Sequence, residues 1–217
     1  MEAEFWHQRW QKNELGFQLD EAHPLLRQYL PAVISGKHKV FVPLCGKSPD
    51  LSYLALHIPV VGAELSAIAC QDFFLEQGLA FEVNQQKTFQ CYQSTNISLW
   101  QGDFFTLTEK HISGCDLVYD RAALIALPAE MRWQYVQKLR QLMPKGGDIL
   151  LISLEYPQHE KQGPPFSVLD KEIKQLFAGA EITLLGTAEL TGKGFARRRF
   201  ATSSLLETVY RITLPPI

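Results

Sequence analysis

The chain has 217 residues, of which 46% are hydrophobic and 20% are charged. This length and composition suit one substantial core, so we expect a single domain over 1–217. The formal net charge of -2 gives no sign of a basic surface for nucleic acid, which leaves a small molecule as the expected ligand. The sequence shows neither an apolar signal-peptide core nor an apolar stretch of the roughly 18 residues that a membrane span requires, so we expect a cytoplasmic protein without a membrane partner.

The four cysteines, Cys45, Cys70, Cys91 and Cys115, are scattered along the chain. They form no C-x-x-C pair, and no histidine stands at a spacing typical of zinc ligands. We therefore expect reduced, mostly buried thiols, and neither disulfides nor a metal site.

Alternating strand and helix patterns begin near residue 39. A β-rich run predicts a strand at 39–44, apolar residues at helical spacing predict a helix over 48–57, and a second β-rich run predicts a strand at 59–65. Ser66 is a suitable N-cap for a further helix, which we expect to end near Gly78. The order of these elements is that of a β-α-β unit.

The alternation continues toward the C-terminus, and crossovers of this length imply parallel strands. The last two predicted strands, at 181–190 and 205–214, have no helix between them and therefore predict an antiparallel hairpin. The other expected elements are strands at 97–105 and 115–124, a turn and strand over 145–156, and helices at 128–143 and 169–178.

Together these elements predict an α/β fold with a doubly wound, mostly parallel sheet of seven strands that ends in an antiparallel hairpin. In such folds, ligands bind outside the carboxyl ends of the strands, at the point where the strand order reverses. The loops that follow the predicted strands are therefore the places to search for a site.

The turn at 43–48, after the first predicted strand, resembles a phosphate-binding loop only in its GKS ending. A P-loop needs a glycine five positions before Gly46, where Phe41 stands, and a dinucleotide loop needs three glycines, whereas this turn has one. Glu64, 18 residues after Gly46, is placed to accept hydrogen bonds from a ribose. A cofactor with adenosine but no phosphates fits this combination, and S-adenosylmethionine is the common one. An ordinary turn followed by a surface glutamate is the alternative.

Six segments, in the same order along the chain, resemble the thiopurine S-methyltransferase family of class I S-adenosylmethionine-dependent methyltransferases, in its bacterial form. The PLCGKS turn and the DRAAL segment distinguish this family from other methyltransferases. The resemblance covers nearly the whole chain and rests on FWHQRWQKNELGFQ (5–18), VFVPLCGKS (40–48), VVGAELS (60–66), ISLWQGDFF (97–105), DLVYDRAAL (116–124) and GPPFSV (163–168).

The resemblance implies a Rossmann-like class I fold and methyl transfer from S-adenosylmethionine to the sulfur of aromatic or heterocyclic thiols such as thiopurines, with S-adenosylhomocysteine as product. Bacterial-type members are associated with selenium and tellurium species as well. Methyl transfer from a sulfonium is an in-line displacement, so the protein must mainly align the reactants and exclude water. An arginine beside the ring would favour the reactive thiolate.

The family pattern also implies which residues contact the cofactor. Leu44 would hold the methionine end through its carbonyl and its apolar side chain, and Glu64 would accept hydrogen bonds from both ribose hydroxyls. Gly102 and Asp103, after the third predicted strand, would meet the adenine. Without the resemblance, Asp103 would be interpreted as a local cap.

The N-terminal segment 1–30 is implied to be a helical cover over the active site. Trp6 and Trp10 lie one helical turn apart, which places them on one face, and Trp10 is implied to contact the cofactor. Simple packing of this helix on the core is the alternative.

On the substrate side, the resemblance implies that Arg121 faces the reacting end of the site, where it would contact the cofactor and act as the catalytic residue. Phe17 matches the family's aromatic substrate contact, and Arg197 stands where the family has one substrate-side arginine. The run of three arginines at 197–199 departs from the family, so the choice among them is open. A surface ion pair for Arg121 and a core position for Phe17 are the alternatives.

Three other functions fit the same fold: a binding protein that holds an adenosine ligand without chemistry, another small-molecule methyltransferase, and a nucleotide-sugar or dinucleotide enzyme. A binding protein that had lost its catalytic activity should have lost Phe17 and Arg121 while it kept Glu64. A dinucleotide enzyme should have more glycines after its first strand. We therefore expect an enzyme that acts as a monomer on a small-molecule thiol.

Overall fold

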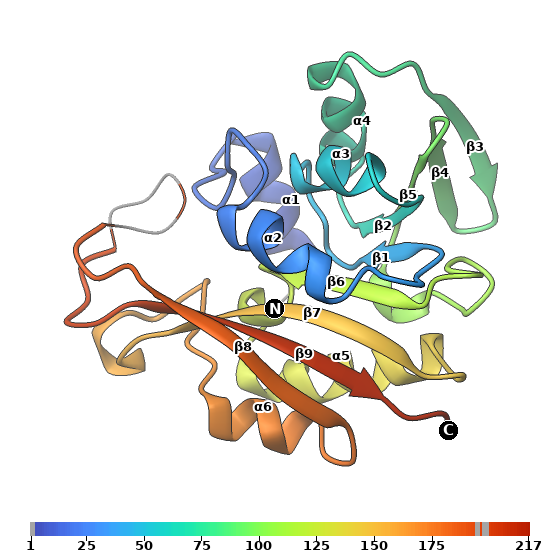
Figure 1. The fold of residues 1–217 in the computed structure, drawn as a ribbon. Helices are drawn as coiled ribbons and strands as arrows, with labels where there is room; N and C mark the ends of the chain where they lie inside the picture. Colours follow the sequence, from blue (N-terminus) through green and yellow to red (C-terminus); the bar gives the residue numbers. More distant parts are fainter. Residues whose placement is uncertain (1–2, 194–195, 197–199) are drawn as a thin grey trace.

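The computed structural model describes residues 3–193, 196 and 200–217. Within these residues, one sheet of nine strands has the order β3-β4-β5-β2-β1-β6-β7-β9-β8 (Figure 1). The strands are β1 (Val40–Val42), β2 (Val60–Glu64), β3 (Glu82–Gln86), β4 (Phe89–Gln93), β5 (Ile97–Gln101), β6 (Leu117–Arg121), β7 (Gly147–Glu155), β8 (Glu181–Glu189) and β9 (Leu206–Leu214). The helices are α1 (Ala3–Gln11), α2 (Pro24–Tyr29), α3 (Asp50–Ala55), α4 (Ala67–Glu76), α5 (Ala129–Leu142) and α6 (Asp170–Leu176), with short 3-10 turns η1 (Leu30–Ala32), η2 (Phe104–Thr106), η3 (Leu124–Ala126) and η4 (Gln158–Glu160).

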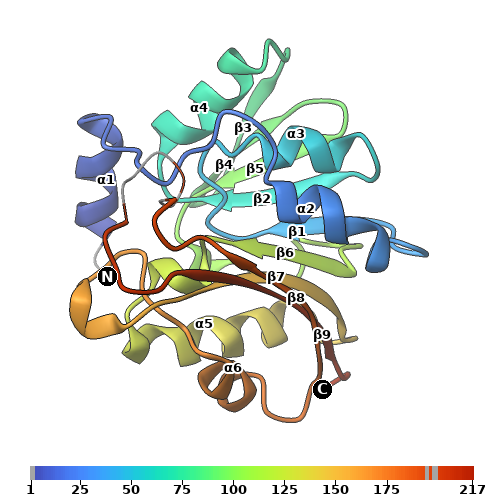
Figure 2. The same cartoon turned by 60° about the vertical axis from the view of Figure 1, so that its left-hand side comes forward.

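The core consists of two layers, one on each face of the sheet, because successive side chains of a strand point to opposite faces. In β1, Phe41 packs into the layer formed with α5 and α6, whereas Val40 and Val42 pack into the layer formed with α2, α3 and α4. In β7, Leu151 and Ile152 divide in the same way. Figure 2 shows α5 and α6 on one side of the sheet and α2 and α3 on the other.

The centre of the sheet is parallel, from β5 through β2, β1 and β6 to β7. The carboxyl ends of these strands therefore meet at one edge. The N-terminal helix α1 lies at this edge, since the Trp10 ring is close to Gly46, which follows β1. This arrangement brings α1 to the loops that we expected to bind a ligand.

The prediction of a mostly parallel sheet of seven strands is wrong. The sheet has nine strands, and four of its eight neighbouring pairs are antiparallel, including the two long pairs β7–β9 and β8–β9. The predicted terminal hairpin is confirmed as β8–β9. The missed strands are the hairpin β3–β4, whose outer strand Glu82–Gln86 is exposed at every residue and so carries no apolar alternation to reveal it.

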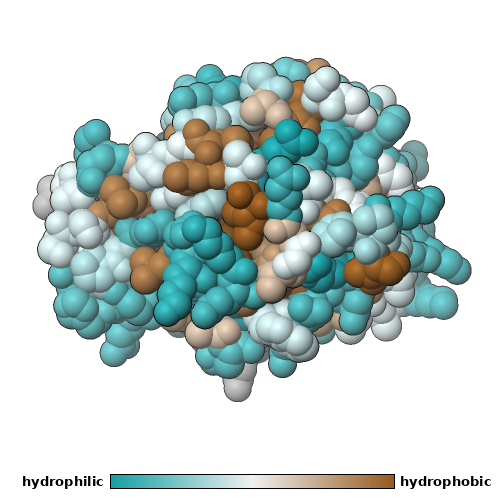
Figure 3. Space-filling view, turned by 60° about the horizontal axis from the view of Figure 1, so that its bottom comes forward, coloured by the Kyte–Doolittle hydropathy of each residue, from teal (hydrophilic) through white to brown (hydrophobic). Residues whose placement is uncertain are grey.

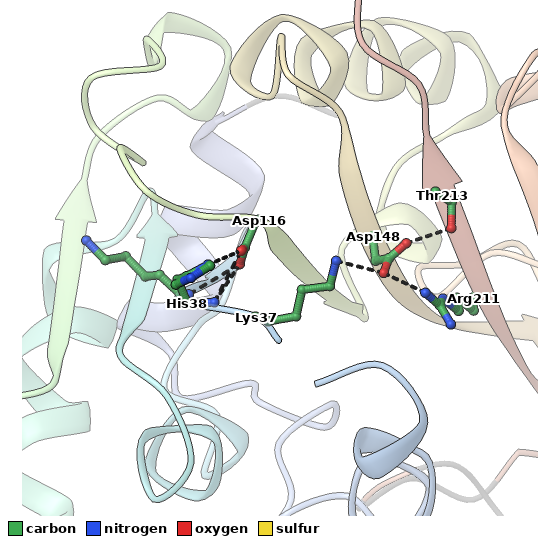
Figure 4. A network of polar contacts seen from close by, with 7 residues as sticks. Lys37, His38, Asp116, Asp148, Arg211 and Thr213 are labelled. Atoms are coloured by element: carbon green, nitrogen blue, oxygen red, sulfur yellow. Dashed lines mark hydrogen bonds and ion pairs between the residues drawn. The ribbon is translucent and has the colours of Figure 1, made fainter. Parts of the chain in front are cut away.

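A network of ion pairs and hydrogen bonds lies at the edge where the parallel strands begin, away from their carboxyl ends (Figure 4). Asp148 at the start of β7 forms ion pairs with Lys37 at 2.8 Å and Arg211 at 2.9 Å, and it accepts a 2.6 Å hydrogen bond from Thr213. Burial raises the pKa of Asp148, but these donors outweigh burial and hold it below its ordinary value. The network connects the chain before β1 to β7 and β9, and it lies away from the loops at the carboxyl edge.

No helix in the described part of the chain combines the length and the apolar character that a membrane crossing demands. Figure 3 shows apolar side chains on one face of the molecule as separate groups between hydrophilic ones. Cys45, Cys70 and Cys91 are buried and Cys115 is half-buried, all as free thiols.

Candidate active site

A cavity of about 350 Å³ lies at the carboxyl edge of the parallel strands. Its wall is mainly apolar and aromatic, with a few polar groups, which is typical of sites for small molecules. The described lining residues are Ala3, Trp6, Arg9, Trp10, Phe17, Leu44, Gly46, Glu64, Leu65, Asp103, Phe104, Phe105, Ala122, Ile125, Ala126, Leu127, Met131, Pro164 and Pro165.

Aromatic residues form the N-terminal side of the cavity. Phe17 packs edge-to-face on Trp10, with ring centroids 5.8 Å apart, and on Trp6, with centroids 5.9 Å apart. A Cβ atom at Gly46 would lie 3.3 Å from the Trp10 ring, so the glycine lets α1 approach the loop after β1 closely. The prediction that Trp6 and Trp10 lie on one helix face holds, because both line the cavity.

Two non-glycine residues with positive φ lie at the cavity, each just after a central strand. Leu44 follows β1 with φ 47°, and Ala122 follows β6 with φ 73°. This conformation costs free energy for residues with a Cβ, and such strain often gathers at ligand sites. The first turn is held by hydrogen bonds, since the Cys45 amide donates to the Ala63 carbonyl at 2.9 Å.

Glu64 at the end of β2 is the buried anion of the site, with 6% of its surface exposed. Its carboxylate accepts hydrogen bonds from the backbone amides of Gly46 at 2.8 Å and Ser66 at 2.7 Å. Burial raises the pKa of the carboxyl group above its ordinary value, because the charged form is removed from water. A carboxylate can accept about four hydrogen bonds, so Glu64 has capacity for the two hydroxyls of a ribose. The site therefore fits a nucleoside group beside Glu64.

Gly102 and Asp103 lie beside Glu64 because β2 and β5 are parallel neighbours. The Gly102 amide donates to the Glu64 carbonyl at 2.9 Å, and a Cβ atom at Gly102 would lie 2.5 Å from the Phe89 ring. The Asp103 carboxylate accepts from the Phe105 amide at 2.9 Å, so it is indeed a local cap, and it also lines the cavity.

Arg121 is the last residue of β6 and immediately precedes Ala122 in the cavity wall. One of its guanidinium nitrogens, Nη1, donates to the backbone carbonyl of Phe17 at 3.4 Å, so the side chain connects β6 to the N-terminal segment. Five of the predicted residues line the cavity, namely Trp10, Phe17, Leu44, Glu64 and Asp103. Gly102 and Arg121 flank it, and Arg197 lies outside the described residues.

A second part of the cavity wall was not predicted as part of the site. It contains Ile125, Leu127, Met131, Pro164 and Pro165. The PPF in GPPFSV and the residues after DRAAL were the available signals, but apolar residues in a loop give no indication of which cavity they face.

The buried Arg132 in α5 holds this wall in place. Its Nε donates to the Leu127 carbonyl at 2.9 Å, and its Nη1 donates to the Glu172 carboxylate at 2.6 Å. Its guanidinium lies 5.6 Å from the centre of the Phe166 ring, and the Phe166 amide donates to the Ile125 carbonyl at 2.7 Å. Arg132 thus connects α5 to the turn at Leu127, to the loop that contains Phe166 and to α6.

Asp120 is a second buried polar residue that sequence reasoning missed. It is 1% exposed, and its carboxylate accepts from the Tyr135 hydroxyl at 2.6 Å and from the Leu124 amide at 3.1 Å. Burial raises its pKa to about 6. These bonds hold the turn that contains Ala122, which lines the cavity.

The raised pKa of Asp120 predicts a pH-dependent stability. Because the folded-state pKa is above the ordinary 3.8, the group favours the folded state below about pH 4, and this contribution is lost as the pH rises through about 6. The free energy of unfolding of the wild type should therefore fall relative to that of Asp120→Asn between these pH values, by about 1.4 kcal/mol for each unit of pKa elevation. Urea unfolding at several pH values measures this difference, and parallel curves for the two proteins would contradict it.

The α/β fold with its parallel centre is shared by solved structures of class I methyltransferases, and the buried glutamate at the end of β2 and the cavity at the carboxyl edge lie where such folds bind their ligands. An S-adenosylmethionine-dependent methyltransferase from Anabaena variabilis matches with a TM-score of 0.67 at 18% identity, over 96% of this chain and 94% of that chain. The N-methyltransferase NodS from Bradyrhizobium japonicum, solved with S-adenosyl-L-homocysteine, matches with a TM-score of 0.62 at 14% identity, over 94% and 97%.

Sequence comparison identifies the family. The family model described as thiopurine S-methyltransferase matches residues 1–214. The thiopurine S-methyltransferase of Pseudomonas fluorescens is 41% identical over 98% of this chain and 97% of its own length, and that of Vibrio vulnificus is 49% identical over 85% of each. The chain belongs to the thiopurine S-methyltransferase family. This confirms the predicted family and the prediction of an S-adenosylmethionine-dependent methyltransferase.

Proposed function

We propose that this enzyme transfers the methyl group of S-adenosylmethionine to the sulfur of an aromatic or heterocyclic thiol such as a thiopurine. The observation that carries the proposal is the buried Glu64 carboxylate at the edge of a cavity with aromatic and apolar walls. When bound, the cofactor supplies a methyl group on a positively charged sulfur. The family membership and the names of the relatives support thiols as the acceptors.

On the cofactor side, Glu64 would accept hydrogen bonds from the ribose hydroxyls. Leu44 would contact the methionine portion through its carbonyl and side chain, and Trp10 would cover the cofactor from α1. Gly102 and Asp103 would border the adenine. These roles are supported by the positions of Trp10, Leu44, Glu64 and Asp103 in one cavity wall and by the bond between Gly102 and Glu64.

On the substrate side, the ring of the thiol would pack against Phe17 and the apolar part of the wall that contains Ile125, Leu127 and Met131. Arg121 would favour the thiolate, whose proton is lost to solvent before the reaction, and Arg197 or one of its neighbours would approach the substrate from the segment outside the described residues. With the cofactor and the thiol held in line, the bond from the methyl carbon to the sulfonium would break as the bond to the thiolate sulfur formed. The residues need only align the two sulfurs and exclude water, so no dedicated base is required.

We also propose that the chain acts as a single-domain monomer in the cytoplasm and that 1–30 covers the active site. The segment after α1 is well anchored, because the His23 amide donates to Asp50 at 2.7 Å and the His23 ring lies 3.0 Å from Glu207. This anchor would allow α1 to move while α2 stays in place.

If 1–30 covers the active site, the hydrogen exchange of α1 should change when the cofactor binds. Amides of α1 should exchange faster than those of the central strands in the free protein, and they should become protected when S-adenosylmethionine binds. Amides of α2, beyond the His23 anchor, should change little and serve as the internal control. Equal protection of α1 with and without the cofactor would show that it is ordinary core.

The proposed reaction is tested by calorimetry with S-adenosylmethionine, NAD and ATP, followed by detection of the methylated product of 6-mercaptopurine. We expect S-adenosylmethionine to bind, NAD and ATP not to bind, and methylated product to form only when the thiol is present. Binding without product from any thiol would favour an adenosine-ligand binding protein. Turnover of other acceptors but not of thiols would favour another small-molecule methyltransferase, and selenium or tellurium compounds are the first acceptors to compare.

A further inference from the structure

One face of α1 borders the cavity with residues at helical spacing. Ala3, Trp6, Arg9 and Trp10 all line it. Residues three and four apart lie on one side of a helix, so the four form a continuous strip. Among the described lining residues, Arg9 is the basic one, in a wall that is otherwise mainly apolar.

The partners of Arg9 leave much of its hydrogen-bonding capacity available. Its guanidinium lies 4.5 Å from the centre of the Phe5 ring, and Nη1 is 3.7 Å from the Glu14 carboxylate, which is longer than a hydrogen bond. Nε is buried and has no hydrogen-bond partner among the described residues. A guanidinium has five N–H donors, and a buried donor without an acceptor costs free energy, so an anion at this position would be stabilised.

The acidic residues of the cavity are not direct partners of Arg9 in the described contacts. Glu64 accepts from backbone amides, and Asp103 accepts from a backbone amide of its own turn. On the other side, Arg9 is connected to Phe17 through a row of rings, since Phe5 packs on Trp6 and Trp6 packs on Phe17. Arg9 is therefore next to the aromatic side where we propose that the thiol binds.

We propose that Arg9 binds an anionic substituent, such as a carboxylate, on the ring of the thiol substrate. This inference rests on the proposed function and deepens it: among aromatic thiols, those with a negative group on the ring are the ones that Arg9 would favour. The apolar walls hold the ring, and Arg9 selects the charge and fixes its orientation. Planar carboxylates match the guanidinium fork, which favours them over other anions.

Two thiols of similar size test the effect of the substituent's charge independently of its size: 4-mercaptobenzoate, which is anionic, and 4-methylbenzenethiol, which is neutral. In Arg9→Gln, KM for the carboxylated thiol should rise about fivefold, and Arg9→Lys should recover part of this loss. KM for the neutral thiol and the Kd of S-adenosylmethionine should stay within about twofold of the wild type. Lys12→Gln removes an exposed positive charge just beyond α1 and is the matched control, which should leave both KM values unchanged.

Equal changes for the two thiols would overturn the proposal, because Arg9 would then act through packing. The proposal would also be overturned if Arg9→Gln bound S-adenosylmethionine more weakly but kept the wild-type ratio of the two KM values. Arg9 would then bind the carboxylate of the cofactor itself. The proposed function itself is tested with 6-mercaptopurine, and if the wild type methylates neither benzenethiol, Arg9 is still tested by calorimetry with benzoate and S-adenosylhomocysteine. Tighter benzoate binding to the wild type than to Arg9→Gln would support the anion site, and equal binding would refute it.

Discussion

Arg121→Met should lower kcat/KM for thiopurines by about tenfold or more, which corresponds to about 1.4 kcal/mol of transition-state stabilisation. Methionine keeps much of the apolar stem of arginine but removes the charge that would favour the thiolate. The change in cofactor affinity should be smaller, because Arg121 flanks the cavity wall and bonds to Phe17 on the proposed substrate side. Steady-state kinetics and calorimetry measure the two effects separately.

The loss in Arg121→Met should shrink as the pH rises, because a substrate that is already ionised in solution gains less from the arginine. Arg27→Met removes a half-exposed arginine from α2 and is the control, with kinetics expected to match the wild type. If Arg121→Met turned over as fast as the wild type at every pH, Arg121 would be a structural residue that holds Phe17. The methyltransferase function itself would survive that result.

Glu64→Ala should weaken S-adenosylmethionine binding by about 1 to 3 kcal/mol, or roughly 5- to 150-fold in Kd. The substitution leaves the ribose hydroxyls without their acceptor in a buried place. It also removes the acceptor of the Gly46 and Ser66 amides, so the loop after β1 loses a support. Calorimetry gives the Kd, and urea unfolding of the free protein shows how much of the effect is structural.

Glu64→Gln is the matched control, since its amide oxygen keeps one acceptor in the same shape. It should bind the cofactor more tightly than Glu64→Ala and less tightly than the wild type. Burial raises the pKa of Glu64, so cofactor binding to the wild type should weaken as the pH falls toward that raised value, whereas the glutamine variant should show no such trend from this position. Unchanged cofactor affinity in Glu64→Ala would remove the ribose assignment.

Patterns of apolar residues in the sequence were sufficient to predict the parallel centre of the sheet and the hairpin β8–β9. The central strands and β9 are buried on one or both faces, and burial leaves a run or an alternation of apolar residues that local sequence displays. β8 has no buried residue and was predicted from its run of apolar and β-branched residues alone. The hairpin β3–β4 was missed for the opposite reason: Glu82–Gln86 is a polar edge strand that pairs through its backbone and needs no apolar side chains.

For the site, motifs located Trp10, Leu44, Glu64 and Asp103, because each lies in or beside a loop whose sequence is distinctive by itself. Only the tertiary structure showed that Arg9 faces the same cavity and that Arg132 and Asp120 support its walls. The reason is physical. A charged residue in a helix or strand is interpreted as exposed until its partners are known, and the partners of a buried one come from distant segments that meet only when the sheet has formed.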